Sequence, residues 1–276
     1  MNSIKLTRRT ALASAAVALA SIGRAHAAEG KLTLTGSSTV APLALEMAKR
    51  FEKQNPGVRI DVQSGGSSRG IADARSGAAQ IGLVSRALKA EERDLIAHTV
   101  ALDGISLILH RSNPVASLSD AQIKAIYTGQ VRNWREVGGP DLPITVVNKA
   151  EGRSTLELFL HYFALSNSQI KPQVVIGDNA QGIKTVAGSV GAIGYVSIGA
   201  ADYEARQGTA IKLLPMGGVA ASVAQVRAGK FPLARPLNLV TRGEPKGLAL
   251  AFIRFAKSQA AHDLVEAQFF VALDAP

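Results

Sequence analysis

Residues 32–70 read LTLTGSSTVAPLALEMAKRFEKQNPGVRIDVQSGGSSRG, and this stretch decides the fold class. Its first four residues alternate leucine with threonine, which is typical of a strand. Apolar residues then recur at helical spacing as far as Phe51, and residues 58–63 alternate as a second strand. A strand, a glycine–serine loop, a helix and another strand in this order indicate an α/β protein with a mostly parallel sheet.

The same alternation continues to the end of the chain. Further strands are predicted at 80–84, 104–109, 144–148, 174–176, 192–196 and 237–241. Helices are predicted at 69–76, 91–97, 119–127, 154–163, 181–187 and 245–257. Ser119 and Gln122 have the spacing of a capping box at the start of the third of these helices. Because a domain usually takes about 100–200 residues, the 249 residues that follow residue 27 predict two similar lobes.

The composition narrows the possible chemistry. The chain has no cysteine, which excludes disulfides, a thiolate nucleophile, cysteine-ligated zinc and iron–sulfur clusters. It has 31 Lys and Arg residues against 21 Asp and Glu residues, a formal net charge of +10. The basic residues are scattered singly with few aromatic residues beside them. This pattern argues against a nucleic-acid partner and suits a small anion.

The N-terminus is typical of an export signal. Lys5, Arg8 and Arg9 form a charged region, and the 13 weakly apolar residues that follow are too few to cross about 30 Å of hydrocarbon. Ala25-His26-Ala27 is a small-x-small cleavage signal, so we expect a signal peptide over 1–27, cleaved after Ala27. We expect export to the periplasm by the twin-arginine or the general secretory route. Cleavage leaves 27 basic against 21 acidic residues, a net charge of +6.

Four loops share one composition at one topological position, the end of a predicted strand. They lie at 36–39, 65–69, 85–86 and 149–155. Glycine lets the backbone approach a ligand closely, the first turn of a helix binds anions, and serine, threonine, lysine and arginine add donors and charge. Each loop alone is explained as well by ordinary helix capping. Their coincidence favours a convergent anion site, because ligands of open α/β sheets bind outside these strand ends.

One motif also fits an enzyme. Residues 66–70, GSSRG, fit the G-x-S-x-G nucleophile elbow of serine hydrolases, and only His262 beside Asp263 follows late enough in the chain to complete a triad. The sequence contains no zinc-protease motif, P-loop or dinucleotide fingerprint, and no carboxylate cluster with metal-ligand spacing. We therefore expect a protein that is not an enzyme and uses neither a cofactor nor a metal.

Seven short motifs occur in order between about residue 31 and residue 270. They are TGSSTV at 35–40, GGSS at 65–68, SR at 85–86, NPV at 113–115, IYTG at 126–129, IGYV at 193–196 and FPLARPL at 231–237. Together they resemble the periplasmic phosphate-binding proteins of ABC importers. The resemblance implies a type II periplasmic binding fold of two lobes, each a mostly parallel sheet flanked by helices, joined by two hinge crossovers.

The resemblance also implies boundaries and site residues. We place the crossovers near 107–111 and 235–238, with lobe one at 28–108 and 237–276 and lobe two at 109–236. The implied ligands from lobe one are Ser38, Thr39, the Val40 amide, Ser67, Ser85 and Arg86. Those from lobe two are Lys149, Arg153, Ser154 and Thr155.

The implied function is capture of an inorganic oxyanion, above all phosphate, by a monomer that delivers it to the membrane permease of an ABC importer. Two features depart from the family pattern. Lys149 stands where relatives commonly carry arginine, and lysine lacks the planar fork of a guanidinium, while Arg153 replaces a small residue. Ser85 stands where some relatives have a carboxylate that accepts the proton of hydrogen phosphate. These departures leave open a secreted surface or sensory protein with weak or altered anion binding.

Overall fold

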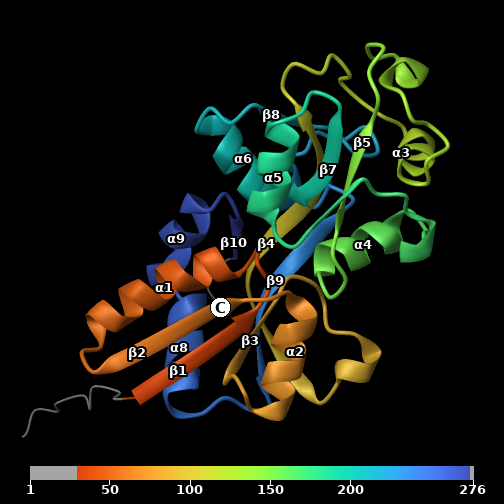
Figure 1. Ribbon diagram of the computed structural model, residues 1–276. Helices are drawn as coiled ribbons and strands as arrows, with labels where there is room; N and C mark the ends of the chain where they lie inside the picture. The colour runs from red at the N-terminus through yellow and green to blue at the C-terminus, as the bar shows by residue number, and fades with distance from the viewer. Residues whose placement is uncertain (1–29, 274–276) are drawn as a thin grey trace, which may run out of the picture.

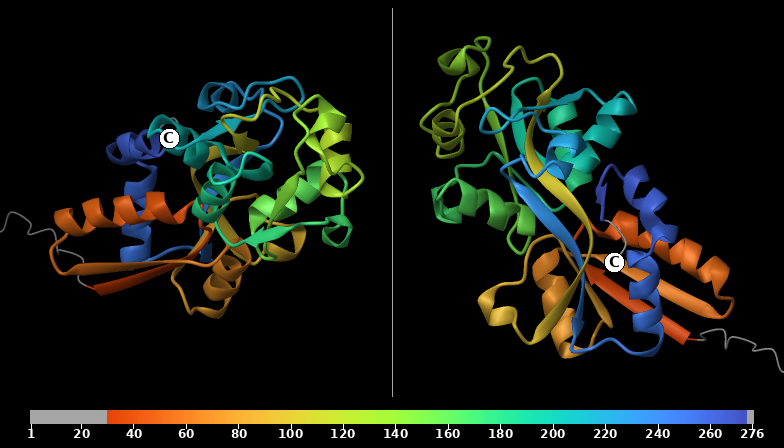
Figure 2. Two further views of the ribbon diagram at one scale, coloured as in Figure 1. Left: turned by 45° about the horizontal axis from the view of Figure 1, so that its top comes forward. Right: turned by 180° about the vertical axis from the view of Figure 1, so that it is seen from behind.

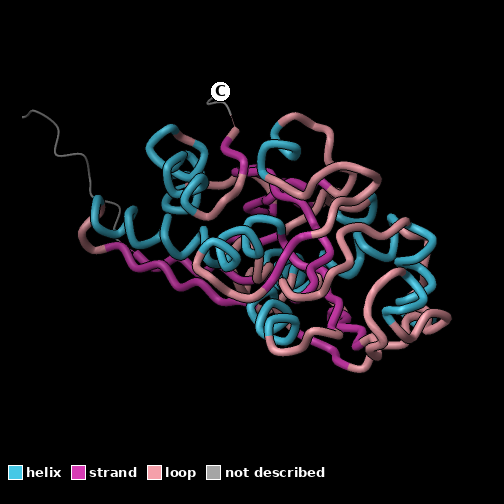
Figure 3. Tube along the Cα trace, turned by 90° about the horizontal axis from the view of Figure 1, so that it is seen from above, coloured by secondary structure: helices cyan, strands magenta, loops and turns pink. Residues whose placement is uncertain are grey.

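The computed structural model describes residues 30–273, and the expected signal peptide at 1–27 lies outside the described residues. Two α/β lobes lie one above the other in Figure 1, with the chain entering at the lower lobe. Seen from above, helices lie on both sides of the strands (Figure 3). No helix within residues 30–273 is both long and apolar enough to cross a membrane.

The lower lobe, lobe one, is built on a sheet in the order β2-β1-β3-β9-β4. These strands are β1 (Gly30–Gly36), β2 (Val58–Ser64), β3 (Ile81–Val84), β4 (Leu95–His110) and β9 (Ala234–Arg242). β1 runs parallel to β2 and β3, whereas β9 is antiparallel to both of its neighbours. The helices of this lobe are α1 (Ala41–Gln54), α2 (Ser67–Ser76), α8 (Gly247–Lys257) and α9 (His262–Ala267).

Lobe two continues the order with β4-β7-β5-β6, and β8 pairs with the far end of β4. Its strands are β5 (Thr145–Lys149), β6 (Val174–Ile176), β7 (Ala192–Ser197) and β8 (Ile211–Leu213). β5 is parallel to β6 and β7, and β4 is antiparallel to β7. Its helices are α3 (Asp120–Tyr127), α4 (Ser154–Tyr162), α5 (Asn179–Ala187), α6 (Ile198–Arg206) and α7 (Val223–Arg227).

β4 and β9 connect the lobes. β4 pairs with β9 from Leu95 to Gly104 and then with β7 from Ile105 to Leu109, so it changes partner between two adjacent residues. The view from behind shows β4 and β9 side by side between the lobes (Figure 2). The partner change precedes the 107–111 segment expected for the first crossover, and the lobe boundaries stay a prediction. A short last strand, β10 (Val271–Ala272), also pairs with β4.

Apolar periodicity explains how the helices pack. Leu43, Met47 and Phe51 form the buried face of α1, each at most 5% exposed, and each contributes about 1.5–3 kcal/mol by leaving water. Phe51 meets Phe252 of α8 edge to face, with ring centroids 5.5 Å apart. The predicted capping box of α3 is confirmed: the Gln122 amide donates to Ser119 Oγ, and the Ser119 amide donates to Gln122 Oε1.

One predicted element is wrong. The segment 91–97 does not form a helix: a single 3-10 turn covers Ala90–Glu92, and β4 already begins at Leu95. Residues 95–97 are drawn into the sheet because they pair with Val240, Thr241 and Arg242 of β9. Tertiary pairing outweighs the helical preference of the acidic residues at 91–92. The sequence reading also missed α6, β8 and α7, which follow one another in lobe two.

Candidate anion-binding site

The structure brings the four predicted loops together between the lobes. Ser37 Oγ donates to Ser85 Oγ over 2.9 Å, and the Ser85 amide donates to Ser67 Oγ over 3.2 Å, which joins the three loops of lobe one. Ser154 at the start of α4 hydrogen-bonds to Ser67, and its Oγ lies 3.0 Å from that of Ser85. Hydroxyl groups from both lobes therefore meet at one buried cluster, which we call the hydroxyl cluster.

The local backbone explains why the lobes come so close. Gly66 precedes α2 with a φ of +99°, and a Cβ there would lie 2.7 Å from the carbonyl oxygen of Gly152 in lobe two. The same Gly152 oxygen accepts a hydrogen bond of 3.2 Å from the amide of Ser68, in the first turn of α2. Any residue larger than glycine at position 66 would strain this backbone and separate the lobes.

Arg235 of β9 is the main residue that the sequence reading missed. Its guanidinium is 1% exposed and pairs with the equally buried Asp103 at 2.9 Å. The remaining donors reach the loops: one nitrogen lies 3.3 Å from Ser85 Oγ and 2.9 Å from Thr155 Oγ1, and the other lies 3.2 Å from Thr39 Oγ1. The carboxylate of Asp103 thus orients the planar guanidinium of Arg235 toward hydroxyls of both lobes.

Lys149 supplies a second buried cation. Its Nζ donates to Asn179 Oδ1 over 3.0 Å, and Asn179 Nδ2 donates to Thr39 Oγ1 over 3.1 Å. Burial, followed by the positive charge of Arg235, lowers the pKa of Lys149 to about 7. The end of β5 is held by Tyr195, whose hydroxyl accepts from the Lys149 amide. Asn179, at the first turn of α5, was also missed, because it lies in no motif and its contacts with Lys149 and Thr39 join residues far apart in the chain.

Arg86 is placed differently from the expectation. Its guanidinium is buried against two carboxylates: both terminal nitrogens donate to Glu92 at 2.7 and 2.8 Å, and Nε lies 3.0 Å from Glu157 Oε2 of α4. The charge of Arg86 is therefore already balanced, and its side chain is directed at an ion-pair group rather than at the hydroxyl cluster. The sequence signal for this pairing is Glu92, six residues further on.

The other expected residues lie around the cluster. Thr155 and Ser154 face it directly, whereas Ser38 is partly exposed beside it. The amides of Thr39 and Val40 both point to Ser37 Oγ, at 3.2 and 3.4 Å. Arg153 is partly exposed at the cleft edge, where a Cβ on Gly66 would meet its Cδ at 3.0 Å and one on Gly177 its Nη2 at 3.3 Å. Whether its guanidinium binds the ligand stays a prediction.

The arrangement suits a small oxyanion. Two buried cations, several rotatable hydroxyls and the first turns of α1, α2 and α4 converge, and such donors are strongest where water is excluded. Two carboxylates that could have faced a protonated anion are engaged elsewhere: Asp73 accepts from Thr35 and Arg69, and Glu151 accepts from Asn167. Within residues 30–273 no three His, Asp or Glu side chains gather where they could hold a metal ion.

Two lobes that enclose such a site define a solute-binding protein of the periplasmic type, and comparison with known proteins agrees. Residues 23–260 match the model of the PBP superfamily domain. Over 238 residues the chain is 32% identical to the phosphate-binding protein PstS of Bacillus subtilis (strain 168), covering 84% of this chain and 77% of that protein. The chain therefore belongs to the PBP superfamily, in the family of the phosphate-binding proteins PstS.

Solved structures confirm the two-lobed fold. A phosphate ABC transporter substrate-binding protein of Clostridium perfringens with bound phosphate superposes with a TM-score of 0.81 at 33% identity, covering 89% of this chain and all of that one. An ABC-type phosphate transport receptor of Vibrio cholerae superposes with a TM-score of 0.70 at 26% identity, covering 88% of this chain and all of the other. The predicted α/β fold class is thus confirmed.

Proposed function

We propose that this protein is an extracytoplasmic solute-binding protein that captures inorganic phosphate between its lobes and delivers it to the membrane permease of an ABC importer. One observation carries the proposal: two buried cations face neutral hydrogen-bonding groups in the cleft. The guanidinium of Arg235 faces hydroxyls of both lobes, and the ammonium of Lys149 donates to Asn179. Buried positive charges without an equal number of carboxylates favour an anion as the missing partner.

The hydrogen bonds indicate how binding works. Thr39 Oγ1 accepts from Arg235 and from Asn179, so its own proton is left to donate to a ligand. The serine hydroxyls that now bond to one another can rotate toward an oxyanion at little cost. Closing the lobes around the anion removes water, which strengthens each of these contacts. A bond to a charged ligand is worth about 1.5–3 kcal/mol, so a few of them suffice for micromolar binding.

The same geometry sets selectivity. Hydrogen phosphate carries a proton that sulfate lacks, and strong rejection of sulfate needs a buried acceptor that sulfate would leave unpaired. Ser85 occupies the relevant place in the loop, and its hydroxyl lies among other hydroxyls. We expect modest preference for phosphate over sulfate, well below the factor of about 10⁴ that a mismatched buried group can supply.

The rest of the proposal follows from the sequence and the family. The signal peptide at 1–27 would direct the chain to the periplasm, where a monomer would meet the permease. The relatives are binding proteins, and the hydrolase reading gains no support: the Ser68 hydroxyl is directed at Glu157, 3.4 Å away, rather than at a histidine. Both cations are in place, so the complete cluster favours capture over a sensory protein with lost binding.

Titration calorimetry tests the proposal. Bound anion is stripped by partial unfolding and dialysis, and the refolded protein is titrated with phosphate and then with sulfate. We expect saturable one-site binding of phosphate in the micromolar range or tighter, with weaker binding of sulfate. Absence of phosphate binding by a folded sample would contradict the proposal, and rejection of sulfate by more than about 10⁴-fold would contradict the assignment of Ser85.

A further inference from the structure

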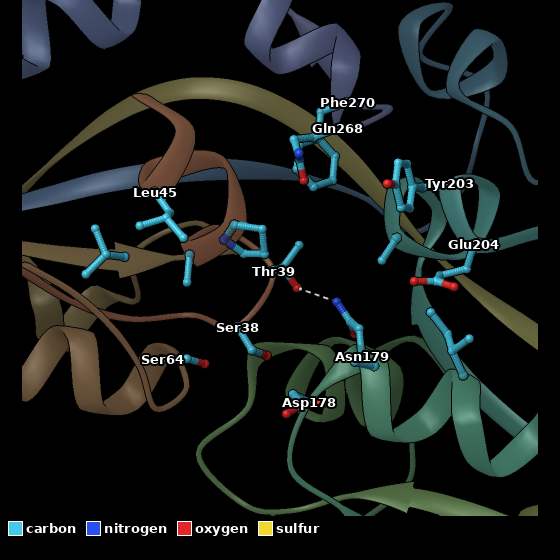
Figure 4. A pocket seen from close by; sticks show the side chains of 16 residues that line it. Ser38, Thr39, Leu45, Ser64, Asp178, Asn179, Tyr203, Glu204, Gln268 and Phe270 are labelled. Atoms are coloured by element: carbon cyan, nitrogen blue, oxygen red, sulfur yellow. Dashed lines mark hydrogen bonds between the residues drawn. The ribbon is translucent and has the colours of Figure 1, made fainter. Parts of the chain in front are cut away.

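A groove of about 490 Å³, lined in part by Thr39 and Asn179, lies on one side of the cleft (Figure 4). Its walls are mainly apolar and come from both lobes: Pro42, Leu45 and Val62 from lobe one, and Ile183 and Tyr203 from lobe two, with Phe270 of the C-terminal segment. Leu45 and Tyr203 are each 43% exposed. A volume of this size lies within the range of about 300–1,000 Å³ that holds small organic ligands.

Two side chains of the groove lie next to the buried cations beside the hydroxyl cluster. Thr39 and Asn179 line the groove, and the hydrogen bond between them spans 3.1 Å from lobe one to lobe two. The same two side chains contact the buried cations, Thr39 through Arg235 and Asn179 through Lys149. One hydrogen bond between neutral groups therefore separates the cations from the apolar walls.

The charges of the groove restrict what fits. Of its lining residues, all within the described part of the chain, Asp178 and Glu204 are acidic and none is basic. A second anionic group is therefore unfavourable there, while an alkyl chain or an ammonium group is favourable. This contrasts with the cations just beyond Thr39 and Asn179.

We propose that the groove is a subsite for the organic group of a small phosphomonoester or phosphonate. This inference rests on the proposed function, because the phosphoryl group would occupy the hydroxyl cluster. The substituent, a short alkyl or aminoalkyl chain, would pass between Thr39 and Asn179 in place of their hydrogen bond. Each methylene group that enters the groove should raise affinity about fourfold. An amino group at the end of the chain lies toward Asp178 and Glu204.

Direct and competition titrations test this subsite. Methyl phosphate, propyl phosphate and 3-aminopropyl phosphate are titrated alone, and then against inorganic phosphate, into the protein and into Leu45→Ala and Tyr203→Ala. We expect propyl phosphate, with two more methylene groups, to bind about 15-fold more tightly than methyl phosphate, and the aminopropyl ester more tightly still. Each variant should lower propyl phosphate affinity about 5- to 20-fold and leave that of inorganic phosphate unchanged. Val175→Ala, at an exposed apolar residue outside the groove lining, is the matched control.

The outcomes separate the two proposals. Binding of phosphate without binding of any ester overturns the subsite and leaves the proposed function intact. Esters that bind independently of chain length, or equally well in both variants, also overturn it. Esters that bind while inorganic phosphate does not would support the subsite and contradict phosphate capture. Failure of every ligand contradicts both. A Glu204→Gln variant that weakens only the aminopropyl ester supports the amine preference, and one that changes nothing overturns it.

Discussion

The two sides of the cleft close by different means. On the side between α2 and α4, which we call the ion-pair side, Glu157 of lobe two lies 3.0 Å from Arg86 and 2.9 Å from Lys89 of lobe one. On the side between α1 and α5, the groove side, neutral Thr39 and Asn179 meet across the lobes beside exposed apolar side chains. Figure 1 shows α2 and α4 on one side and α1 and α5 on the other.

The difference separates closure from recognition. Glu157 is 25% exposed and Lys89 is 44% exposed, so their attraction is screened by water and salt, and a surface pair of this kind contributes about 0–1 kcal/mol. Thr39 and Asn179 are buried and bonded to the two buried cations. We expect the ion-pair side to favour the closed lobes and the groove side to determine what they close upon.

The largest effect is expected where both sides meet, at Arg235. Arg235→Met removes the fork that joins Thr39 of the groove side to Thr155, and should lower phosphate affinity about 10²- to 10⁴-fold, measured by calorimetry. It also leaves Asp103 buried without its partner, which should cost about 3–5 kcal/mol of stability in a denaturant titration.

A double variant distinguishes these two consequences. Asp103→Asn added to Arg235→Met removes the unpaired charge and can still accept from the Gly199 amide. We expect the double variant to regain most of the lost stability and none of the lost affinity. Recovery of phosphate binding would show that Arg235 serves folding alone.

Thr39→Val tests the groove side directly. It keeps the β-branched shape and removes the hydroxyl proton, so phosphate affinity should fall about 10- to 150-fold with the protein still folded. Ser68→Ala on the ion-pair side is the matched control, because this hydroxyl also faces the other lobe, 3.4 Å from Glu157. Equal losses in both variants would abolish the distinction between the two sides.

Lys149 predicts a dependence on pH. Its pKa of about 7 in the empty protein means that the amine is mostly neutral above pH 7. A bound anion favours the ammonium form and raises the pKa of Lys149, so binding takes up protons. The uptake should approach one proton per site near pH 8 and be small below about pH 6. Affinity should accordingly fall as pH rises above 7, by up to about tenfold per unit.

Calorimetry in buffers of different ionisation enthalpy measures this proton uptake. Lys149→Arg is the control, since arginine stays charged throughout the range, and subtracting its uptake removes the titration of phosphate itself. The same uptake in both proteins would show that Lys149 is already charged when the site is empty.

The smallest effect is expected from Glu157→Gln on the ion-pair side. Arg86 keeps both of its bonds to Glu92, so no buried charge is left unpaired. Phosphate affinity should fall by at most about fivefold at low salt, and the difference should vanish near 0.5 M salt. A salt-independent loss as large as that of Thr39→Val would place Glu157 among the ligand contacts.

Local patterns were enough to predict most strands and helices and the four loops. Apolar spacing and glycine–serine turns act within a few residues, and they predicted that the loops of Ser67, Ser85 and Ser154 lie together, as they do in the structure; that these residues bind an anion stays a prediction. Arg235 and Asn179 escaped because their roles depend on a strand that crosses between lobes and on contacts over the closed cleft. The partners of Arg86 were not predicted for a similar reason: one of its two carboxylate partners, Glu157, comes from the other lobe. The spacing of residues along the chain does not predict which charges pair across the cleft.

The position of β9 in the sheet of lobe one has a consequence for biosynthesis. β9 lies between β3 and β4, yet its residues follow the whole of lobe two in the chain. A growing chain therefore carries β3 and β4 without their common neighbour until residues 234–242 have been made. Because such distant pairing forms late and slowly, the N-terminal half emerges unable to complete its own sheet. The order of synthesis keeps the first lobe open until the last part of the chain appears.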